Sequence, residues 1–315
     1  MTEAEQKSTR DGVGRGLLAL GEKNPAVVVL SADLKESTRA DAFAERYPQR
    51  FVEMGVAEQN MAGVAAGLAL GQKIPFMLSY SVFSPGLNLG IIRSAIAYSN
   101  LPVKIIGGHS GLATGADGAT HQALEDLAVM RTLPNFTVLA PADEDEAYQM
   151  TLAAAELPGP VYIRTSKLPV PSLAQASDFA VGQVTVVHAG DDACIIAHGT
   201  MVSRALATAK LLSEQGIACR VINCSSIKPL DEKTILTAFR ETHAVVSVED
   251  HQVAGGLGST IAELVAQQTV RSAFKILGVQ DSFGESGSAS ELYEKHGLTA
   301  KNIADQVQQL IQHHS

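Results

Sequence analysis

The sequence has no tryptophan, only three cysteines, and aromatic residues that make up just 5% of its 315 positions. Cys194, Cys219 and Cys224 are too few, and lie too close together in apolar runs, for a disulfide framework or a zinc site, so we expect buried thiols. No apolar run reaches the roughly 18 residues that a membrane span needs. These absences favour a soluble protein of a reducing compartment, and cytoplasmic localisation is the expectation.

Basic charge is also scarce. The chain has 24 lysines and arginines against 33 aspartates and glutamates, a formal net charge of −9, and no basic cluster offsets this excess. Such a balance argues against nucleic-acid and anionic-membrane partners. Hydrophobic residues make up 46% and charged residues 18%, which is a globular composition. Any site for an anionic ligand must therefore be basic only locally.

Short apolar runs alternate with helix-period segments along both halves of the chain. This alternation predicts two doubly wound α/β domains with mostly parallel sheets. We expect strands at residues 27–31, 51–55, 76–80, 103–107, 138–140, 161–164, 193–198, 219–224, 244–249 and 274–279. We expect helices at residues 41–47, 59–70, 89–98, 124–130, 144–157, 202–215, 230–239, 260–268 and around 303–311.

The pattern breaks after residue 167, where two prolines fix an extended chain that cannot continue a helix. We therefore expect a first domain at residues 1–170, a linker at 171–185 and a second domain at 186–315. A chain of this length suits two domains, each able to bury its own core.

Glu58 lies at the first turn of a predicted helix, in a loop that follows a strand. A carboxylate there is common, because it complements the helix dipole. Gly63 and Gly67, in the same segment, lower helix propensity, which indicates close packing of another backbone across a chain interface. A glutamate that only complements the dipole does not require such an interface, so Glu58 is a candidate functional residue.

Residues 107–122 are rich in glycine and also hold His109, Asp117 and His121. Loops this long are uncommon without secondary structure and are often functional. A lone histidine would suggest a structural hydrogen bond, whereas two histidines and an aspartate on one loop favour a site.

Tyr80 and Phe83 follow a predicted strand, three residues apart. They are either core residues or one wall of a pocket for a flat ring. Arg164 ends a predicted strand and Arg10 precedes the first predicted helix; each is a surface charge unless the fold brings them together as an anion site. The glycine-rich stretch at residues 255–259 lacks the spacing of a dinucleotide-binding turn.

Taken together, these loops resemble the transketolase family along nearly the whole chain. The segment G-V-A-E-Q-N resembles the one that carries the family's glutamate, and D-G-A-T-H-Q-A-L-E-D resembles its histidine loop. By the same matching, S-A-D-L-K-E-S places Asp33 near the cofactor and Ser37 near a substrate phosphate. Five other residues fall on family positions: Arg10, His109, Asp117, His121 and Arg164.

The resemblance implies thiamine diphosphate as the cofactor, bound between two chains, with its aminopyrimidine held here and its diphosphate and Mg²⁺ held by another domain. The family's magnesium motif, G-D-G with a later asparagine, has no counterpart in this sequence. The family carries that domain N-terminally, whereas this chain begins almost at Arg10. We therefore expect a separately encoded N-terminal, diphosphate-binding subunit, self-association across the pyrimidine-binding domain, and an α2β2 assembly.

The implied activity is transfer of a two-carbon ketol unit from an anionic ketose to an aldose. Glu58 would share a proton with the pyrimidine ring, on which Tyr80 and Phe83 would stack. The resemblance implies substrate contacts for the remaining residues: His109 and His121 at the donor's carbonyl or C1 hydroxyl, Asp117 at a substrate hydroxyl, and Arg10, Ser37 and Arg164 at a distal phosphate.

One departure from the family concerns the cofactor pocket and the substrate. Relatives usually offer a third aromatic or basic side chain where this sequence has Gly86 or Leu87. A sugar that carries a different anion, such as a sulfonate, therefore stays open as the substrate.

Other readings stay open as well. A decarboxylating relative is one: the β chain of a 2-oxoacid dehydrogenase, or deoxyxylulose-phosphate synthase, which generally has no histidine at the place of His109. A noncatalytic partner subunit and a nucleotide-binding domain are the others, and fold alone does not decide among them.

Overall fold

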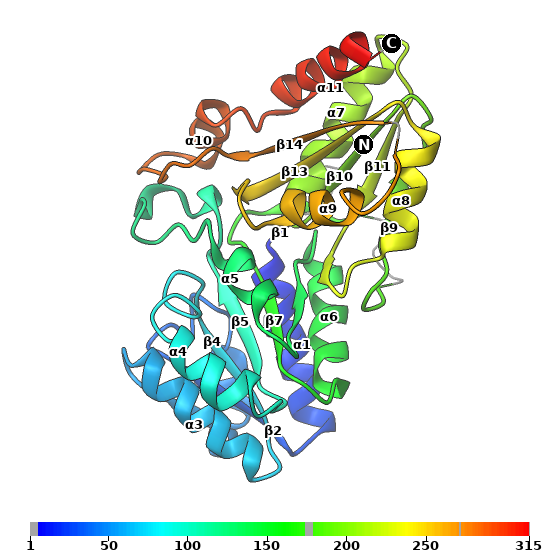
Figure 1. Cartoon of the computed structure of the whole chain (residues 1–315). Helices are drawn as coiled ribbons and strands as arrows, with labels where there is room; N and C mark the ends of the chain where they lie inside the picture. The colour runs from blue at the N-terminus through cyan, green and yellow to red at the C-terminus, as the bar shows by residue number, and fades with distance from the viewer. Residues whose placement is uncertain (1–5, 174–178, 271, 315) are drawn as a thin grey trace.

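The computed structural model describes residues 6–173, 179–270 and 272–314. It contains two α/β layers built on mostly parallel sheets, one for each half of the chain (Figure 1), so the predicted fold class is confirmed. Part of the predicted linker at 171–185, namely residues 174–178, lies outside the described residues.

The first sheet has seven strands in the order β12-β6-β7-β5-β4-β2-β3, and all neighbours are parallel except β12 and β6. Its strands are β2 (Val27–Ser31), β3 (Phe51–Glu53), β4 (Ile74–Tyr80), β5 (Lys104–Gly108), β6 (Thr137–Leu139), β7 (Val161–Arg164) and β12 (Ser226–Lys228). Strand β12 comes from the second half of the chain, which sequence patterning did not predict. The second half therefore contributes directly to the first sheet.

The second sheet has five strands in the order β14-β13-β10-β11-β9, with only β9 antiparallel to its neighbour. Its strands are β9 (Thr185–His188), β10 (Ala193–Ala197), β11 (Cys219–Asn223), β13 (Ala244–Gln252) and β14 (Ala273–Val279). A small antiparallel ladder pairs β1 (Gln6–Lys7) with β8 (Val170–Pro171).

Helices cover both sheets. The α-helices are α1 (Thr9–Lys23), α2 (Asp41–Arg46), α3 (Glu58–Leu70), α4 (Leu89–Ile91), α5 (Asp126–Thr132), α6 (Glu144–Glu156), α7 (Met201–Ser213), α8 (Glu232–Glu241), α9 (Leu257–Val265), α10 (Ala289–Lys295) and α11 (Ala300–His314). The others are the 3₁₀ helices η1 (Pro48–Arg50) and η3 (Leu112–Asp117) and the π-helix η2 (Ile92–Ala97).

The expectation that Arg10 precedes the first helix is wrong, because Arg10 is the second residue of α1. Asp11 starts this helix by accepting a hydrogen bond from the backbone N–H of Ser8 at 2.9 Å. Several glycines lower the helix propensity of the segment and obscured the pattern. The fold needs at least one of them, since a Cβ at Gly12 would lie 2.0 Å from the carbonyl oxygen of Glu144 in α6.

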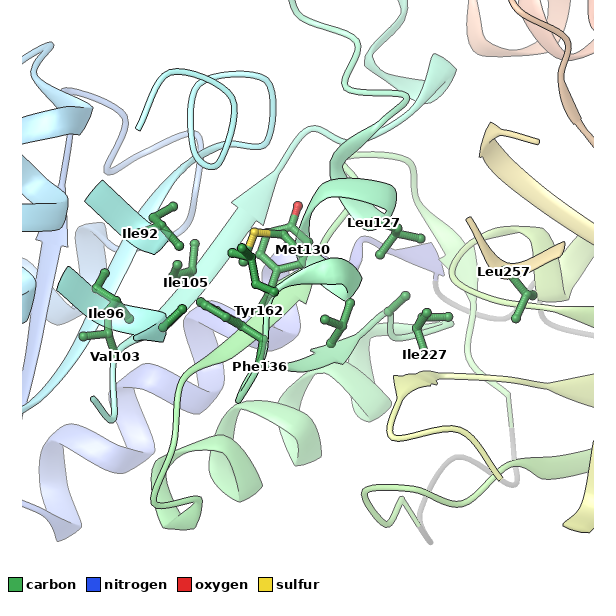
Figure 2. Packing of buried hydrophobic residues seen from close by; sticks show 14 of the residues in the cluster. Ile92, Ile96, Val103, Ile105, Leu127, Met130, Phe136, Tyr162, Ile227 and Leu257 are labelled. Carbon is green, nitrogen blue, oxygen red and sulfur yellow. The ribbon is translucent and has the colours of Figure 1, made fainter. Parts of the chain in front are cut away.

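The two halves share a hydrophobic core. One buried cluster contains Leu127 and Met130 of α5, Ile227 of β12 and Leu257 of α9, all labelled in Figure 2, and it also includes Tyr162. Burial of this apolar surface fixes the two sheets relative to each other. The predicted burial of the three cysteines is confirmed. Among the described residues, no helix is long and apolar enough to cross a membrane.

Candidate active site

Glu58 is the first residue of α3, as predicted, and its side chain is buried. The hydroxyl of Ser79, on β4, donates to Glu58 Oε1 at 3.1 Å, and the side-chain amide of Asn88 donates to the backbone carbonyl of Glu58 at 3.1 Å. Among the described residues, no other hydrogen bond reaches the Glu58 carboxylate. One carboxylate oxygen is therefore free to bind a ligand.

Four aromatic rings cluster after strands β4 and β5. The rings of Tyr80 and Phe83 are nearly parallel, 12° apart with centroids 5.9 Å from each other. The imidazole of His109 stacks on Tyr80 with centroids 3.8 Å apart, and His121 meets the Phe83 ring edge-on at 5.4 Å. The fold thus unites residues that sequence reasoning had placed on two separate loops, and they form a wall for a flat ligand.

His109 is buried, and its environment favours the neutral imidazole. Burial, together with the positive charges of Arg10 and Lys167, lowers its pKa to about 3. Its Nδ1 atom is buried and has no hydrogen-bond partner in the described structure. His109 also has a φ of 53°, which is uncommon for a residue other than glycine. A neutral, unpartnered imidazole can exchange a hydrogen bond with a substrate oxygen.

Lys167 belongs to this group, although sequence reasoning did not select it. Its ammonium pairs with the Asp117 carboxylate at 3.1 Å, and its charge acts on His109. The residue follows β7 by three positions, so the rule that sites gather after the carboxyl ends of parallel strands could have found it. The predicted residue Asp117 is exposed at the edge of the cluster.

Arg10 and Ser37 lie together, because the Arg10 guanidinium donates to the backbone carbonyl of Ser37 at 3.0 Å. Burial and the neighbouring charge of Arg39 lower the pKa of Arg10 from its usual value. The Arg10 Nε atom is buried without a partner in the described structure. Asp33 is exposed after β2 with a φ of 59°, and its backbone N–H donates to Glu53.

Arg164 ends β7, where its backbone lies opposite Gly107, two residues before His109. Its guanidinium donates to the Asp126 carboxylate at 3.0 Å and to the backbone carbonyls of Asp250 and Ala123 at 2.7 and 3.4 Å. Both side chains of the Arg164–Asp126 ion pair are buried. Its Nε and Nη2 atoms thus connect β7 to the second sheet, whereas no hydrogen bond within the described residues engages Nη1.

Gly86 has no room for a side chain. A Cβ atom there would lie 1.9 Å from the carbonyl oxygen of Val82. Leu87, the next residue, is largely exposed to solvent. The turn after Phe83 therefore leaves the aromatic wall without the third side chain that the resemblance led us to look for.

A free carboxylate at a helix start, parallel aromatic rings and two histidines, at the strand ends of a doubly wound sheet, define a candidate site for a flat heteroaromatic cofactor. Two family models match the sequence, the transketolase pyrimidine-binding domain over residues 5–172 and the transketolase C-terminal domain over residues 182–303. The chain therefore belongs to the transketolase family, whose members depend on thiamine diphosphate, and the resemblance is confirmed.

Similar proteins include subunits of two transketolases. The chain is 38% identical over 303 residues to the 6-deoxy-6-sulfo-D-fructose transketolase subunit of Clostridium sp. strain MSTE9, covering 95% of this chain and 93% of that protein. It is 35% identical over 289 residues to an apulose-4-phosphate transketolase subunit of Phocaeicola vulgatus, covering 91% of this chain and 92% of that protein.

A solved structure described as a split-gene transketolase, in an inactive β4 tetramer, is 43% identical to this chain. The TM-score between the two structures is 0.90, and the match covers 98% of this chain and 100% of that chain.

Proposed function

We propose that this chain is the pyrimidine-binding subunit of a two-subunit transketolase that transfers a two-carbon ketol unit from an anionic ketose to an aldose. The observation that carries this proposal is the position of Glu58, whose carboxylate keeps one free oxygen at the start of α3 and is bonded to Ser79, the residue before Tyr80. Bound thiamine diphosphate would supply an acidic thiazolium carbon that acts as nucleophile and electron sink.

The residues present fit an aminopyrimidine. Glu58 would hold a proton at the ring nitrogen, while Tyr80 and Phe83 would stack on the ring. Asp33 would lie near the cofactor, as the family resemblance implies. A buried carboxylate bonded by only one neutral hydroxyl suits proton exchange better than a carboxylate neutralised by an ion pair.

The two histidines would bind the donor sugar. His109, neutral because burial and nearby cations lower its pKa to about 3, would hydrogen-bond the donor carbonyl or C1 hydroxyl. His121, at the edge of Phe83, would act on the same oxygens and stabilise the charge that develops there. Asp117 would accept a hydrogen bond from a sugar hydroxyl.

The distal anion of the sugar would lie between Arg10, Ser37 and Lys167. Arg10 and Lys167 both act electrostatically on His109, so their charges converge on one region. The Nε and Nη2 atoms of Arg164 are bonded to Asp126 and to backbone carbonyls, so only its Nη1 donors would be left for the anion that the family resemblance assigns to this residue. Two similar subunits are named for sugars with a sulfonate and a phosphate, which supports an anionic sugar without choosing the anion.

A partner subunit would supply the diphosphate and Mg²⁺ sites. Exposed apolar side chains lie before α3, at its end and after η2: the exposed fractions of Val56, Leu70 and Tyr98 are 80%, 73% and 87%. A Cβ at Gly63 or Gly67 would meet no atom within 4 Å, so the close packing predicted for these glycines does not occur within the described chain. These uncovered positions leave the α3 face available to a protein interface.

The similar split-gene chain was solved as an inactive β4 tetramer, which agrees with activity that requires a second subunit. We therefore propose an α2β2 complex in which self-association occurs across the pyrimidine-binding domain. In this assembly, the α3 face would be covered by the neighbouring chains.

The test is to co-produce this chain with its diphosphate-binding partner, add thiamine diphosphate and Mg²⁺, and measure ketol transfer from a ketose phosphate and a ketose sulfonate to an aldose. We expect transfer by the pair and by neither chain alone. Activity with pyruvate only would assign the chain to the decarboxylating relatives. Inactivity with every donor would leave a noncatalytic subunit.

Replacing Glu58 tests the role that carries the proposal. Glu58→Gln keeps the shape but removes the proton-holding carboxylate, so we expect transfer to fall at least about 100-fold with a nearly unchanged melting temperature. Glu45→Gln, an exposed change on α2, is the matched control and should retain activity. Turnover of the Glu58→Gln pair at the wild-type rate would remove Glu58 from the mechanism.

A further inference from the structure

The loop that carries the two histidines is held by an aspartate of the other half of the chain. Asp250, on β13, is buried, and its Oδ1 accepts a hydrogen bond from the backbone N–H of Leu112 at 2.8 Å. Its Oδ2 accepts from the N–H of Ala113 at 3.4 Å and from the Tyr293 hydroxyl of α10 at 2.8 Å. One carboxylate thus fixes the start of η3, the helix between His109 and His121.

The loop is built to admit this carboxylate. Gly111 has a φ of 82°, and a Cβ there would lie 2.2 Å from Asp250 Oδ2. Leu112 and Ala113 belong to the same buried hydrophobic cluster as Tyr293, in the second half of the chain. In Figure 1, η3 belongs to the teal segment that approaches the orange helix α10, and the two elements are in contact. Residues of the second half of the chain therefore pack against one side of this loop.

The far end of the loop is held in the same way. The Gln122 amide, one residue after His121, donates to the carbonyl of Glu285 at 2.9 Å and to that of Gly115 at 3.2 Å. A Cβ at Gly284 would lie 1.9 Å from Gln122 Oε1, so the segment after β14 fits closely against this side chain. Both ends of the histidine loop are thus anchored to the second half.

The same aspartate is connected to the aromatic loop. The backbone carbonyl of Asp250 accepts from Arg164, which is paired with Asp126. Asp126 accepts a hydrogen bond from the Tyr162 hydroxyl at 2.7 Å, and that hydroxyl bonds to Ser81, the residue after Tyr80. A continuous buried polar network therefore joins Asp250 to the segment that carries Tyr80 and Phe83.

We infer that Asp250 is a positioning residue, through which the C-terminal half holds His109 and His121 against the Tyr80 and Phe83 rings. The catalytic meaning of this inference rests on the proposed function of those four residues. His109 lies in the left-handed backbone region, and such a conformation persists only where the surroundings impose it. The Thr114 hydroxyl of η3 donates to the His109 carbonyl, so the helix start that Asp250 holds is connected directly to the His109 backbone.

The test compares two changes of neighbouring residues on β13. Asp250→Asn weakens the acceptor for the histidine loop while keeping its size. Glu249→Gln is the matched control, because Glu249 is equally buried and accepts from the backbone N–H groups of Leu257 and Gly258 at the start of α9. Amide hydrogen exchange of the intact chain is the readout, and it does not depend on activity.

In the Asp250→Asn variant we expect amides at residues 109–123 to exchange at least about 10-fold faster, with α9 unchanged. The Glu249→Gln variant should accelerate exchange at the start of α9 and leave the histidine loop unchanged. Tyr293→Phe keeps the Asp250 carboxylate but removes one hydrogen-bond donor to it, so amide exchange in the same loop should accelerate by a smaller factor. This variant replaces Asp250→Asn in the test if Asp250→Asn does not fold. Unchanged loop exchange in both variants, or equal acceleration over the whole second sheet, would overturn the inference.

Steady-state kinetics of the complex with the partner subunit test the catalytic consequence of this positioning. Asp250→Asn should lower kcat about 10-fold or more with KM changed less than 3-fold, because the loop, and not the anion site, is displaced. Faster loop exchange in Asp250→Asn, together with a wild-type complex that transfers no ketol unit, would uphold the positioning role and defeat the proposed function. A normal kcat for Asp250→Asn despite a loosened loop would overturn the inference.

Discussion

Two cations three residues apart, Arg164 and Lys167, have opposite surroundings. Arg164 is buried in an ion pair with Asp126, whereas the Lys167 side chain is 30% exposed at the edge of the candidate site. The Nε and Nη2 atoms of Arg164 are taken by a carboxylate and two carbonyls, which leaves Nη1 for a ligand. Arg164 therefore supports the fold, its contact with a substrate anion stays a prediction, and Lys167 is the additional anion-binding residue that we propose.

Removing the Arg164 charge should destabilise the fold. Arg164→Met would leave Asp126 buried without its counter-ion, so we expect the free energy of unfolding to fall by about 3–5 kcal/mol. Arg15→Met, which breaks an exposed ion pair with Asp145, should cost no more than about 1 kcal/mol. Urea denaturation of the two variants checks the contrast, and similar losses in both would contradict the buried-pair argument.

Removing the Lys167 charge should act on substrate binding. Lys167→Ala is expected to raise KM for an anionic ketose about 10-fold, because a charge-assisted contact is lost, and to change kcat much less. With an uncharged ketose the variant should behave like the wild type. An equal effect on both donors in transfer assays would show that Lys167 does not bind the distal anion.

At the scale of elements, the turn between β4 and α4 decides how the aromatic wall ends. Gly86→Ala would force a Cβ against the Val82 carbonyl, so we expect a loss of about 1–3 kcal/mol in unfolding free energy. Gly90→Ala is the matched control, since a Cβ there meets nothing within 4 Å and the residue lies in helix α4. A Gly86→Ala protein as stable as the control would show that the turn can relax.

Sequence patterning predicted the elements whose periodicity is local. Strands β2 and β7 begin and end where their apolar runs do, and Glu58 stands at the start of its helix as expected. Helix α1 was missed because its glycines serve contacts with α6, which no local pattern reveals. Strand β12 was missed because its partner, β6, is far away in sequence.

The candidate site, like the fold, was predictable where its residues are close together in the sequence. Residues within one loop, such as His109 and His121, could be grouped from sequence and a family resemblance. The pairing of Lys167 with Asp117, and the burial of Arg164 by Asp126, depend on three-dimensional proximity alone. Charges separated by tens of residues carry no local signal of whether they meet each other or a ligand.

At the scale of the whole molecule, acidic side chains are buried where the two halves meet. Glu146 bonds to Asn223, across the two halves, and Glu249 lies near His198 and His251 in the second. Burial raises the pKa of Glu146 and of Glu249 to about 7 each, from a usual value of 4.5. Burial lowers the pKa of His251 to about 4, from 6.5. A lower pH therefore favours the folded state through the two glutamates and disfavours it through His251.

The pH dependence of stability has opposite signs for the buried glutamates and for His251. A glutamate with a raised pKa contributes stability that is fully present below about pH 4.5 and is lost as pH rises through 7, because the folded state holds the proton longer. His251 contributes stability that is present above pH 6.5 and is lost as pH falls through 4. In wild type these contributions oppose each other between about pH 4.5 and 6.5.

Glu249→Gln isolates the carboxylic part, since the variant keeps every histidine and Glu146. As pH rises from 5 to 8, the difference in free energy of unfolding between variant and wild type should shift in favour of the variant by up to about 3 kcal/mol, because the Glu249 pKa is raised from 4.5 to about 7. Urea denaturation of both proteins at several pH values in this range measures the difference. Parallel stability curves for the two proteins would mean that Glu249 does not hold its proton in the fold, and that the neighbouring charges of Arg164 and Arg131 outweigh burial.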